Sequence, residues 1–186
     1  IEDVTAHLRS ATINVNFHAL SNINGSAFND GMLSIRNLVL TASCPVGILC
    51  MLISLKVEPT STASIWDSTF SVTSGTWNYG LLSFATGYAD MVQLKNVTTY
   101  CGPATFNCHG VVLPLGRLVT IEDSFLKSES GGVKHLLSRA VSSASVNATI
   151  VNTVFWTRSA AGVTGQSAAG MFQSGGSVIT FRGCTF

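Results

Sequence analysis

The sequence predicts an all-β fold, a right-handed parallel β-helix (solenoid) of about six coils with roughly 29 residues each. Three observations lead to this prediction: a short phrase recurs six times, apolar and polar residues alternate around each copy, and helical periodicity is scarce. A near-constant period indicates units that stack and bury surface mainly against their neighbours. The hydrophobic anchors of the six copies, which are 30, 29, 27, 29 and 31 residues apart, are Ile35, Ile65, Leu94, Ile121, Ile150 and Phe181.

Each anchor lies in a predicted strand whose alternate side chains share one face. Around the third anchor, Val92, Leu94 and Asn96 are expected to face inward, and Gln93 and Lys95 outward. A second short apolar stretch, usually opened by glycine, lies between successive anchors. Two or three strands per coil favour a parallel β-helix. A β-propeller needs about 40 residues per blade, and leucine-rich repeats need a leucine skeleton that this chain lacks.

Two residues after each anchor the phrase carries Asn, Asp or Gly, the residues that tolerate a left-handed backbone bend. This bend ladder, expected to face inward, comprises Asn37, Asp67, Asn96, Asp123, Asn152 and Gly183. Five residues after each anchor a mostly apolar ladder is predicted, which comprises Leu40, Phe70, Thr99, Leu126, Phe155 and Phe186. Both ladders would repeat the same contact from coil to coil.

The repeats are predicted to occupy residues 31–186, whereas residues 1–30 fit the period poorly and are expected to form an irregular or shortened first coil. Residues 13–16 resemble the phrase but lie only 22 residues before the anchor Ile35. The last copy of the phrase runs to Phe186, and the repeats are expected to continue beyond this chain in a longer protein.

Cysteine spacing predicts two local disulfides, Cys44 with Cys50 and Cys101 with Cys108, because both pairs bracket loops at similar positions two coils apart. Disulfides are typical of the secretory pathway. Buried free thiols are the alternative, and a zinc site is disfavoured because the two-residue cysteine spacing is absent. Cys184 is left over, and its partner is expected to lie beyond this chain.

Three sequons predict N-linked glycans at Asn24, Asn96 and Asn147. An inward-facing Asn96 would exclude an oligosaccharide, so Asn24 and Asn147 are the favoured acceptors. Together with the cysteine pairs, the sequons predict an extracellular or cell-surface location.

Composition excludes several classes of function. Charged residues make up 10% of the chain, the net charge is +1 and there is no basic stripe, so no nucleic-acid partner is expected. The longest apolar run, residues 46–55, is about half the length of a membrane span, so no span is expected in this segment. Histidine, cysteine and carboxylate side chains lack the spacing of metal ligands, and neither a metal nor another cofactor is predicted.

No catalytic residue is predicted. Glycoside hydrolysis needs two converging carboxylates. The adjacent residues Glu122 and Asp123 are expected to point outward and inward respectively, and Asp67 belongs to the bend ladder. The outward aromatic residues Trp66, Trp77 and Trp156 are the candidate contacts for a sugar ring or a partner protein. The alternative is that these rings pack beneath long loops.

The phrases IWDSTF (residues 65–70), IEDSFL (residues 121–126) and FRGCTF (residues 181–186), set in spacers rich in Ser, Gly and Val, resemble the dispersed gene family surface proteins of trypanosomes. The resemblance covers residues 35–186. It implies a very large, secreted, glycosylated protein with pectin-lyase-like β-helix repeats that serves adhesion, and it supplies no catalytic residues.

The function predicted is therefore a non-catalytic structural or adhesive segment of a large extracellular or cell-surface β-helix glycoprotein. Its expected partners are N-linked glycans and an extracellular protein or carbohydrate. The first alternative is a building block of an extracellular filament or flagellar appendage that self-assembles through its coil edges. A polysaccharide lyase or hydrolase is the third reading.

Overall fold

The computed structural model describes residues 2–9, 17–21, 32–44, 50–54, 62–78, 82–83, 88–113, 115–129, 134–139, 146–158, 167–171 and 178–186. The described residues form strands and no helix, as expected from a chain whose Val, Ile and Thr are interrupted by Gly and Ser. Among them there is accordingly no helix of the length and apolarity needed to cross a membrane.

The strands are β1 (Glu2–Arg9), β2 (Phe17–Ser21), β3 (Met32–Ser43), β4 (Cys50–Ser54), β5 (Thr62–Asn78), β6 (Leu82–Ser83), β7 (Tyr88–Leu113), β8 (Leu115–Glu122), β9 (Phe125–Ser128), β10 (Lys134–Arg139), β11 (Val146–Val151), β12 (Val154–Thr157), β13 (Ser167–Met171) and β14 (Val178–Arg182).

Every described strand pair is parallel, and the predicted repeat sets the register. The anchors are backbone partners of one another in unbroken order: Ile35 with Ile65, Ile65 with Leu94, Leu94 with Ile121, Ile121 with Ile150 and Ile150 with Phe181. The spacings of 27 to 31 residues between the anchors are therefore the offsets between neighbouring strands. The prediction of an all-β, parallel, repeating structure is confirmed.

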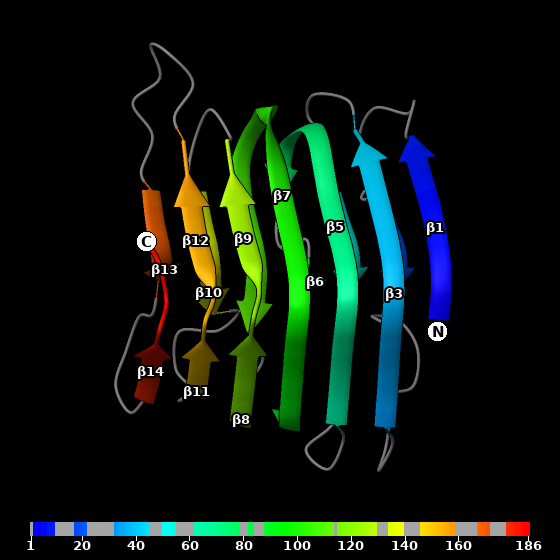
Figure 1. Cartoon of the computed structure of the whole chain (residues 1–186). Helices are drawn as coiled ribbons and strands as arrows, with labels where there is room; N and C mark the ends of the chain where they lie inside the picture. Colours follow the sequence, from blue (N-terminus) through cyan, green and yellow to red (C-terminus); the bar gives the residue numbers. More distant parts are fainter. Residues whose placement is uncertain are drawn as a thin grey trace.

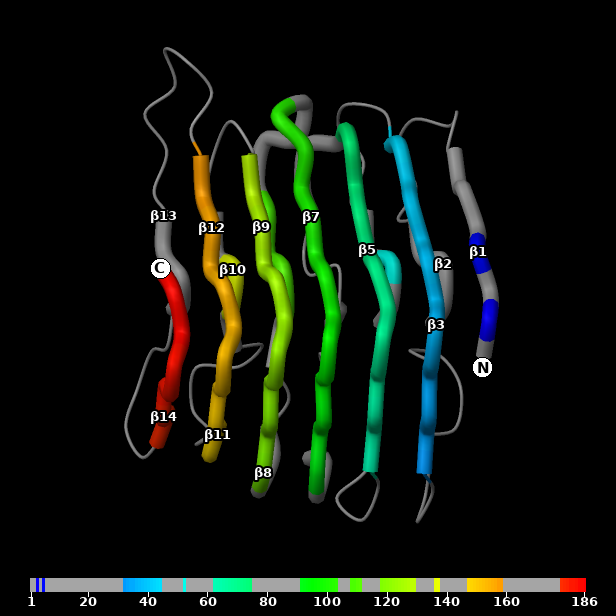
Figure 2. The backbone as a smooth tube through the Cα atoms, viewed as in Figure 1, coloured from blue at the N-terminus to red at the C-terminus, as the bar shows by residue number. Residues whose placement is uncertain are grey.

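The strands form two layers (Figure 1). In the front layer β1, β3, β5 and β7 lie side by side, followed by β8 with β9, β11 with β12, and β14. Behind them, β2, β4, β6, the end of β7, β10 and β13 pair with one another in the same order. Figure 2 shows the strongly curved backbone of β7, which belongs to both layers.

The core lies between the layers, and each position in it recurs once in every repeat. The anchors Ile35, Ile65, Leu94, Ile121 and Ile150 are at most 1% exposed, and Leu52, Val111, Leu136 and Leu137 meet them from the back layer as part of the same cluster. The predicted ladder five residues after the anchors is also buried from Leu40 to Phe155. Phe186 differs: it stacks on Phe155 with ring centroids 5.1 Å apart but is 70% exposed, because no repeat covers it in this structure.

The bend ladder adopts the predicted backbone, and its direction differs from the prediction. The six residues have φ between 48° and 62°, the left-handed region. All six are exposed, so the expectation that Asn96 and Asp123 face inward is wrong. The physical reason is that a left-handed residue is not extended and interrupts the alternation of faces. The next inward side chain therefore follows the anchor by three residues instead of two, as Val97 and Ser124 do.

The exposed ladder alternates between carboxylate and amide. Its order along the sheet is Asp3, Asn37, Asp67, Asn96, Asp123, Asn152 and Gly183. Each asparagine donates from Nδ2 to the preceding aspartate, over 2.8 Å to Asp3, 2.8 Å to Asp67 and 3.2 Å to Asp123. Because like charges on adjacent strands repel, the alternation keeps the carboxylates two strands, roughly 10 Å, apart. At Gly183 a Cβ would lie 2.7 Å from Asn152 Oδ1, which explains glycine at this end of the ladder.

A row of hydroxyl groups beneath the ladder satisfies the backbone at the bend. Ser68 Oγ accepts from the N–H of Leu38 (3.1 Å) and donates to the carbonyl of Trp66 (2.7 Å). Ser124 forms the same two bonds two repeats later, with the N–H of Val97 and the carbonyl of Glu122, and Thr153 donates to the carbonyl of Val151. Cys184 occupies the equivalent position in the last copy, is free, and lies 3.4 Å from the carbonyl of Ile150. Within this structure the thiol takes the place of a hydroxyl in this row, and a disulfide partner beyond this chain stays a prediction.

The chain start belongs to the sheet. β1 pairs with β3 from Glu2 with Arg36 to Arg9 with Ser43, and Asp3 has φ 54° as the first member of the ladder. Glu2–Arg9 therefore form a regular strand, and the irregular or shortened first coil expected over residues 1–30 stays a prediction. The phrase-like residues 13–16 lie outside the described residues, whereas β2 pairs with β4.

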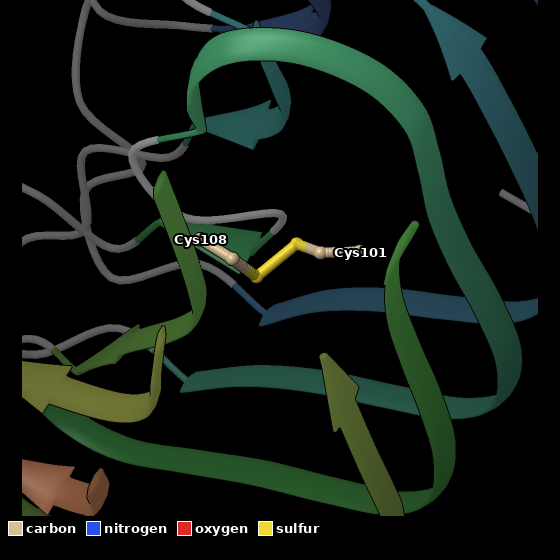
Figure 3. Close-up of a disulfide and its surroundings, with 2 residues drawn as sticks. All are labelled: Cys101 and Cys108. Carbon is tan, nitrogen blue, oxygen red and sulfur yellow. A yellow bond between two sulfur atoms is a disulfide. The ribbon is translucent and has the colours of Figure 1, made fainter. Parts of the chain in front are cut away.

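The predicted disulfide between Cys101 and Cys108 is present, and Cys44 is also disulfide-bonded. Cys101 and Cys108 are joined with their Cα atoms 6.2 Å apart, and both are fully buried. Figure 3 shows that the bridge lies inside the curve of the strands, between two parts of β7. The side chain of Cys50, the predicted partner of Cys44, lies outside the described part of the chain.

Candidate functional site

The candidate site is a groove on the outer face of the front layer, where β5, β7 and β8 run side by side (Figure 1). Its volume is about 150 Å³, and its lining consists of Trp66, Gln93, Leu94, Lys95, Thr120 and Glu122. These residues lie immediately before, at or after the anchors of three successive repeats. Register therefore brings them together although they span more than 50 positions in the sequence.

The row after the anchors supplies the aromatic and charged groups. Arg36, Trp66, Lys95 and Glu122 are successive backbone partners across β3, β5, β7 and β8. The Arg36 guanidinium carbon lies 4.0 Å from the centroid of the Trp66 ring, a cation–π contact. Lys95 Nζ lies 3.7 Å from Glu122 Oε2. The lysine side chain is therefore engaged with the glutamate, and both line the groove together with Trp66.

The row before the anchors supplies neutral hydrogen-bonding groups. Gln93 pairs with Ser64 on one side and with Thr120 on the other. Ser64 Oγ donates to Gln93 Oε1 over 3.3 Å, which directs the amide so that its NH₂ group is the part left for another acceptor. The groove therefore offers an aromatic surface, an amide donor, a hydroxyl and a salt-bridged pair at once.

A second outer cluster lies beyond the bend: Tyr100 on β7, Lys127 on β9, Glu129 directly after β9 and Trp156 on β12. Lys127 Nζ lies 4.9 Å from the centroid of the Tyr100 ring and 4.6 Å from that of Trp156, and 3.3 Å from Glu129 Oε1. The Tyr100 hydroxyl donates to Glu129 Oε2 over 2.7 Å. The Tyr100 hydroxyl, the Lys127 ammonium and the Glu129 carboxylate each have a partner within the cluster, which is typical of a structural network.

The Tyr100–Glu129 hydrogen bond changes the titration of both groups. It stabilises the neutral phenol and, with burial and the charge of Glu129, raises the pKa of Tyr100 to about 12. The same hydrogen bond, followed by Lys127, lowers the pKa of Glu129. Because the folded pKa of Tyr100 exceeds its ordinary value of 10.0, its contribution to stability is complete below pH 10.0 and is lost as the pH rises toward 12.

We expect the phenolate of Tyr100 to appear with a midpoint near pH 12 in an ultraviolet absorbance titration. Subtracting the titration of Tyr100→Phe isolates this residue from the other tyrosines. In Glu129→Gln the charged acceptor is absent, so the midpoint is expected to fall toward about 10. An unchanged midpoint in Glu129→Gln would contradict the assigned cause.

The structure places the sequence-predicted site residues in different surroundings. Trp66 lines the groove, and Trp156 is half-buried against Lys127. Trp77 lies in β5, but its side chain is outside the described part, as is the whole of Asn24. Asn147 is exposed at the point where the register between β11 and β8 shifts. Asn96 is exposed as well, but its Nδ2, the atom that a glycan would use, already donates to Asp67.

Sequence reasoning missed Gln93, Lys95 and Glu122 as members of one site. Their proximity was implicit in the repeat, because residues at equal distances from successive anchors become cross-strand neighbours. In the described part of the chain, no group of three or more His, Cys, Asp or Glu side chains is arranged to hold a metal ion. Comparisons with protein-family models, curated proteins and solved structures give no match to this chain.

Proposed function

We propose that this chain is a non-catalytic structural or adhesive segment of a large extracellular or cell-surface β-helix glycoprotein. The observation that carries the proposal is the unbroken pairing of the anchors, repeat to repeat, from Ile35 to Phe181. A stack of this kind grows by about 4.8 Å per repeat and presents the same outer positions in rows. Such a body suits the display of a surface more than the enclosure of a reaction.

The finer fold proposed is a right-handed parallel β-helix. Its support is that β8, β9 and β10 follow one another in the chain and pair respectively with β11, β12 and β13, the equivalent strands of the next repeat. Parallel strands joined by crossovers are right-handed in almost all proteins. The exposed Asp–Asn ladder would then mark one corner of each coil.

Deletion of one whole repeat tests this architecture. Removing residues 94–120 joins Gln93 to Ile121 in phase, because Leu94 and Ile121 are register partners. A stack held by nearest-neighbour contacts is expected to stay folded, with β circular dichroism and a cooperative thermal transition. The matched control removes residues 94–107, which is out of phase and is expected to unfold the chain. Unfolding of both variants would contradict the proposed β-helix.

The extracellular part of the proposal is supported by the buried Cys101–Cys108 bridge and by the exposed sequon residue Asn147. A glycan on Asn96 would remove the donor that Asp67 accepts, so Asn147 is the favoured acceptor of the two. Peptide mapping of chain secreted from eukaryotic cells tests this assignment. Absence of glycan from both positions would count against a glycoprotein.

The non-catalytic part is supported by the partners of the described acidic side chains. Asp3, Asp67 and Asp123 accept from asparagines of the ladder, Glu122 is paired with Lys95, and Glu129 is bonded to Tyr100. A pair of carboxylates engaged in this way is poorly suited to glycoside cleavage. Hydrolysis or lyase activity on a panel of polysaccharides would overturn this part of the proposal.

A filament building block is the second candidate, and the β14 edge favours it. Val178 is 61% exposed, Phe181 39% and Phe186 70%, at an edge whose strand has one paired side. The β1 edge carries Asp3 at the phrase position that Gly183 occupies directly after β14, so a second copy would meet β14 in phase. Sedimentation at increasing concentration tests this candidate, and a monomer at all concentrations would exclude it.

The resemblance to the trypanosome dispersed gene family agrees with the first candidate and is proposed on the sequence alone.

A further inference from the structure

We propose that the outer groove of β5, β7 and β8 binds one neutral pyranose ring, stacked on Trp66. This inference rests on the proposed function, because it names the ligand class through which the displayed surface would adhere. The geometry of Trp66, the polar groups around it, and the charge and size of the groove support this ligand.

One face of the Trp66 ring is covered by Arg36, and the groove lies beside the other face. The guanidinium of Arg36 covers the ring at 4.0 Å, from the side of β3. Arg36 does not line the groove, whereas Lys95 and Glu122 from β7 and β8 do. The groove therefore lies on the side of the indole that faces away from β3. Arg36 also holds the ring in place, so little side-chain freedom is left to lose when a flat ligand stacks on it.

A set of polar groups lies around that face of the ring. Ser64 occupies Gln93 Oε1, so the amide NH₂ is the donor available to a ligand. Glu122 supplies a carboxylate acceptor and Lys95 an ammonium donor, and the hydroxyl of Thr120 can either donate or accept a hydrogen bond. A sugar presents hydroxyl groups around its rim and C–H groups on its faces, which matches donors and acceptors around one aromatic surface.

The paired charges of the groove favour a neutral ligand. Lys95 and Glu122 lie 3.7 Å apart, and both side chains are about half exposed (57% and 44%). Their charges offset each other within the groove, and Arg36 is engaged on the far side of Trp66. A carboxylate or sulfate on the ligand would approach Lys95 only beside Glu122. The groove thus provides no uncompensated charge for an ionic ligand.

The size of the groove limits the ligand to a single ring. The volume of about 150 Å³ is below the 300–1,000 Å³ of pockets for drug-sized molecules, so it fits a single ring. A protein partner would need roughly 800 Å² of surface on this side, far beyond these six residues. Only one carboxylate, Glu122, lines the groove, so cleavage of the bound sugar is not part of the proposal.

Saturation-transfer NMR with the methyl glycosides of glucose, galactose and mannose tests the inference on the purified chain. We expect saturation transfer to at least one glycoside, with a millimolar dissociation constant and a dose-dependent shift of the Trp66 indole N–H signal. Trp66→Ala is expected to weaken binding at least tenfold, and Trp66→Phe, which keeps an aromatic face, is expected to lose less. Trp156→Ala is the matched control, because Trp156 lies outside the groove, and it should bind like the parent chain.

Three results would overturn the inference: no transfer to any of the three glycosides, equal binding by Trp66→Ala, or tighter binding of methyl glucuronoside than of the neutral glycosides. Thermal melting of each variant separates lost binding from lost folding. The readout is independent of the proposed function, which the repeat deletion tests. If the in-phase deletion variant folds while the intact chain binds none of the glycosides, the groove alone is rejected and the β-helix stands. Unfolding of both deletions would reject the β-helix, whatever the NMR result for the intact chain.

Discussion

Replacing Phe70 by alanine is expected to lower the free energy of unfolding by about 3–5 kcal/mol. Phe70 is fully buried and is the largest of the fully buried side chains among the described residues. It lies between Leu40 and Thr99 in the ladder five residues after the anchors. Both neighbouring repeats would lose contacts with the ring, and strands held in register on both sides cannot close the cavity. Urea unfolding followed by circular dichroism measures the change.

Phe125→Ala is the matched control, because it removes the same atoms from the same kind of strand. Phe125 is 37% exposed and lies on the outer side of β9, so the expected loss is about 1 kcal/mol. Equal losses in the two variants would contradict the assignment of Phe70 to the interior of the stack.

Removing the buried disulfide through Cys101→Ala combined with Cys108→Ala is expected to cost about 2–3 kcal/mol. The bridge closes a loop with a sequence separation of 7, and a loop of this length loses that amount of chain entropy in the unfolded state. Alanine avoids leaving two hydroxyl groups in the core, where both cysteines are fully buried. Thermal and urea unfolding of the double variant under oxidising conditions measure the loss.

Cys184→Ser provides the control for the disulfide. Cys184 is free and occupies the position at which Ser68, Ser124 and Thr153 donate to a backbone carbonyl. Serine is therefore expected to change stability by no more than about 0.5 kcal/mol. A loss in Cys184→Ser as large as that of the double variant would show that general cysteine replacement, rather than the bridge, is responsible.

The strand register was readable from the sequence, because a repeated phrase pairs with its own next copy. Ile65 meets Ile35 and Leu94 since each is the same point of a similar unit. The identity of the bend residues was readable for a local reason, as Asn, Asp and Gly tolerate a positive φ. The first strand was missed because Asp3 precedes Asn37 by 34 residues, outside the 27 to 31 of the other copies.

The direction of the bend ladder was not readable from alternation. Alternation assumes an extended chain, and the left-handed residue itself breaks that assumption, so Asn96 and Asp123 are exposed. The site was readable only in part. Trp66 was expected on the outer face. Its contact with Arg36 and the pairing of Lys95 with Glu122 depend on how long side chains lean between neighbouring strands.

The sequence by itself determined the repeat, the parallel register, the bend positions and the buried rows, because each follows from a residue type recurring at one interval. Only the tertiary structure decided which way the ladder faces, that the Cys184 thiol lies against the carbonyl of Ile150, and that a groove opens beside Trp66. These outcomes depend on the path of the backbone through the bend and on side-chain contacts between strands. Neither is encoded in the spacing of residues along the chain.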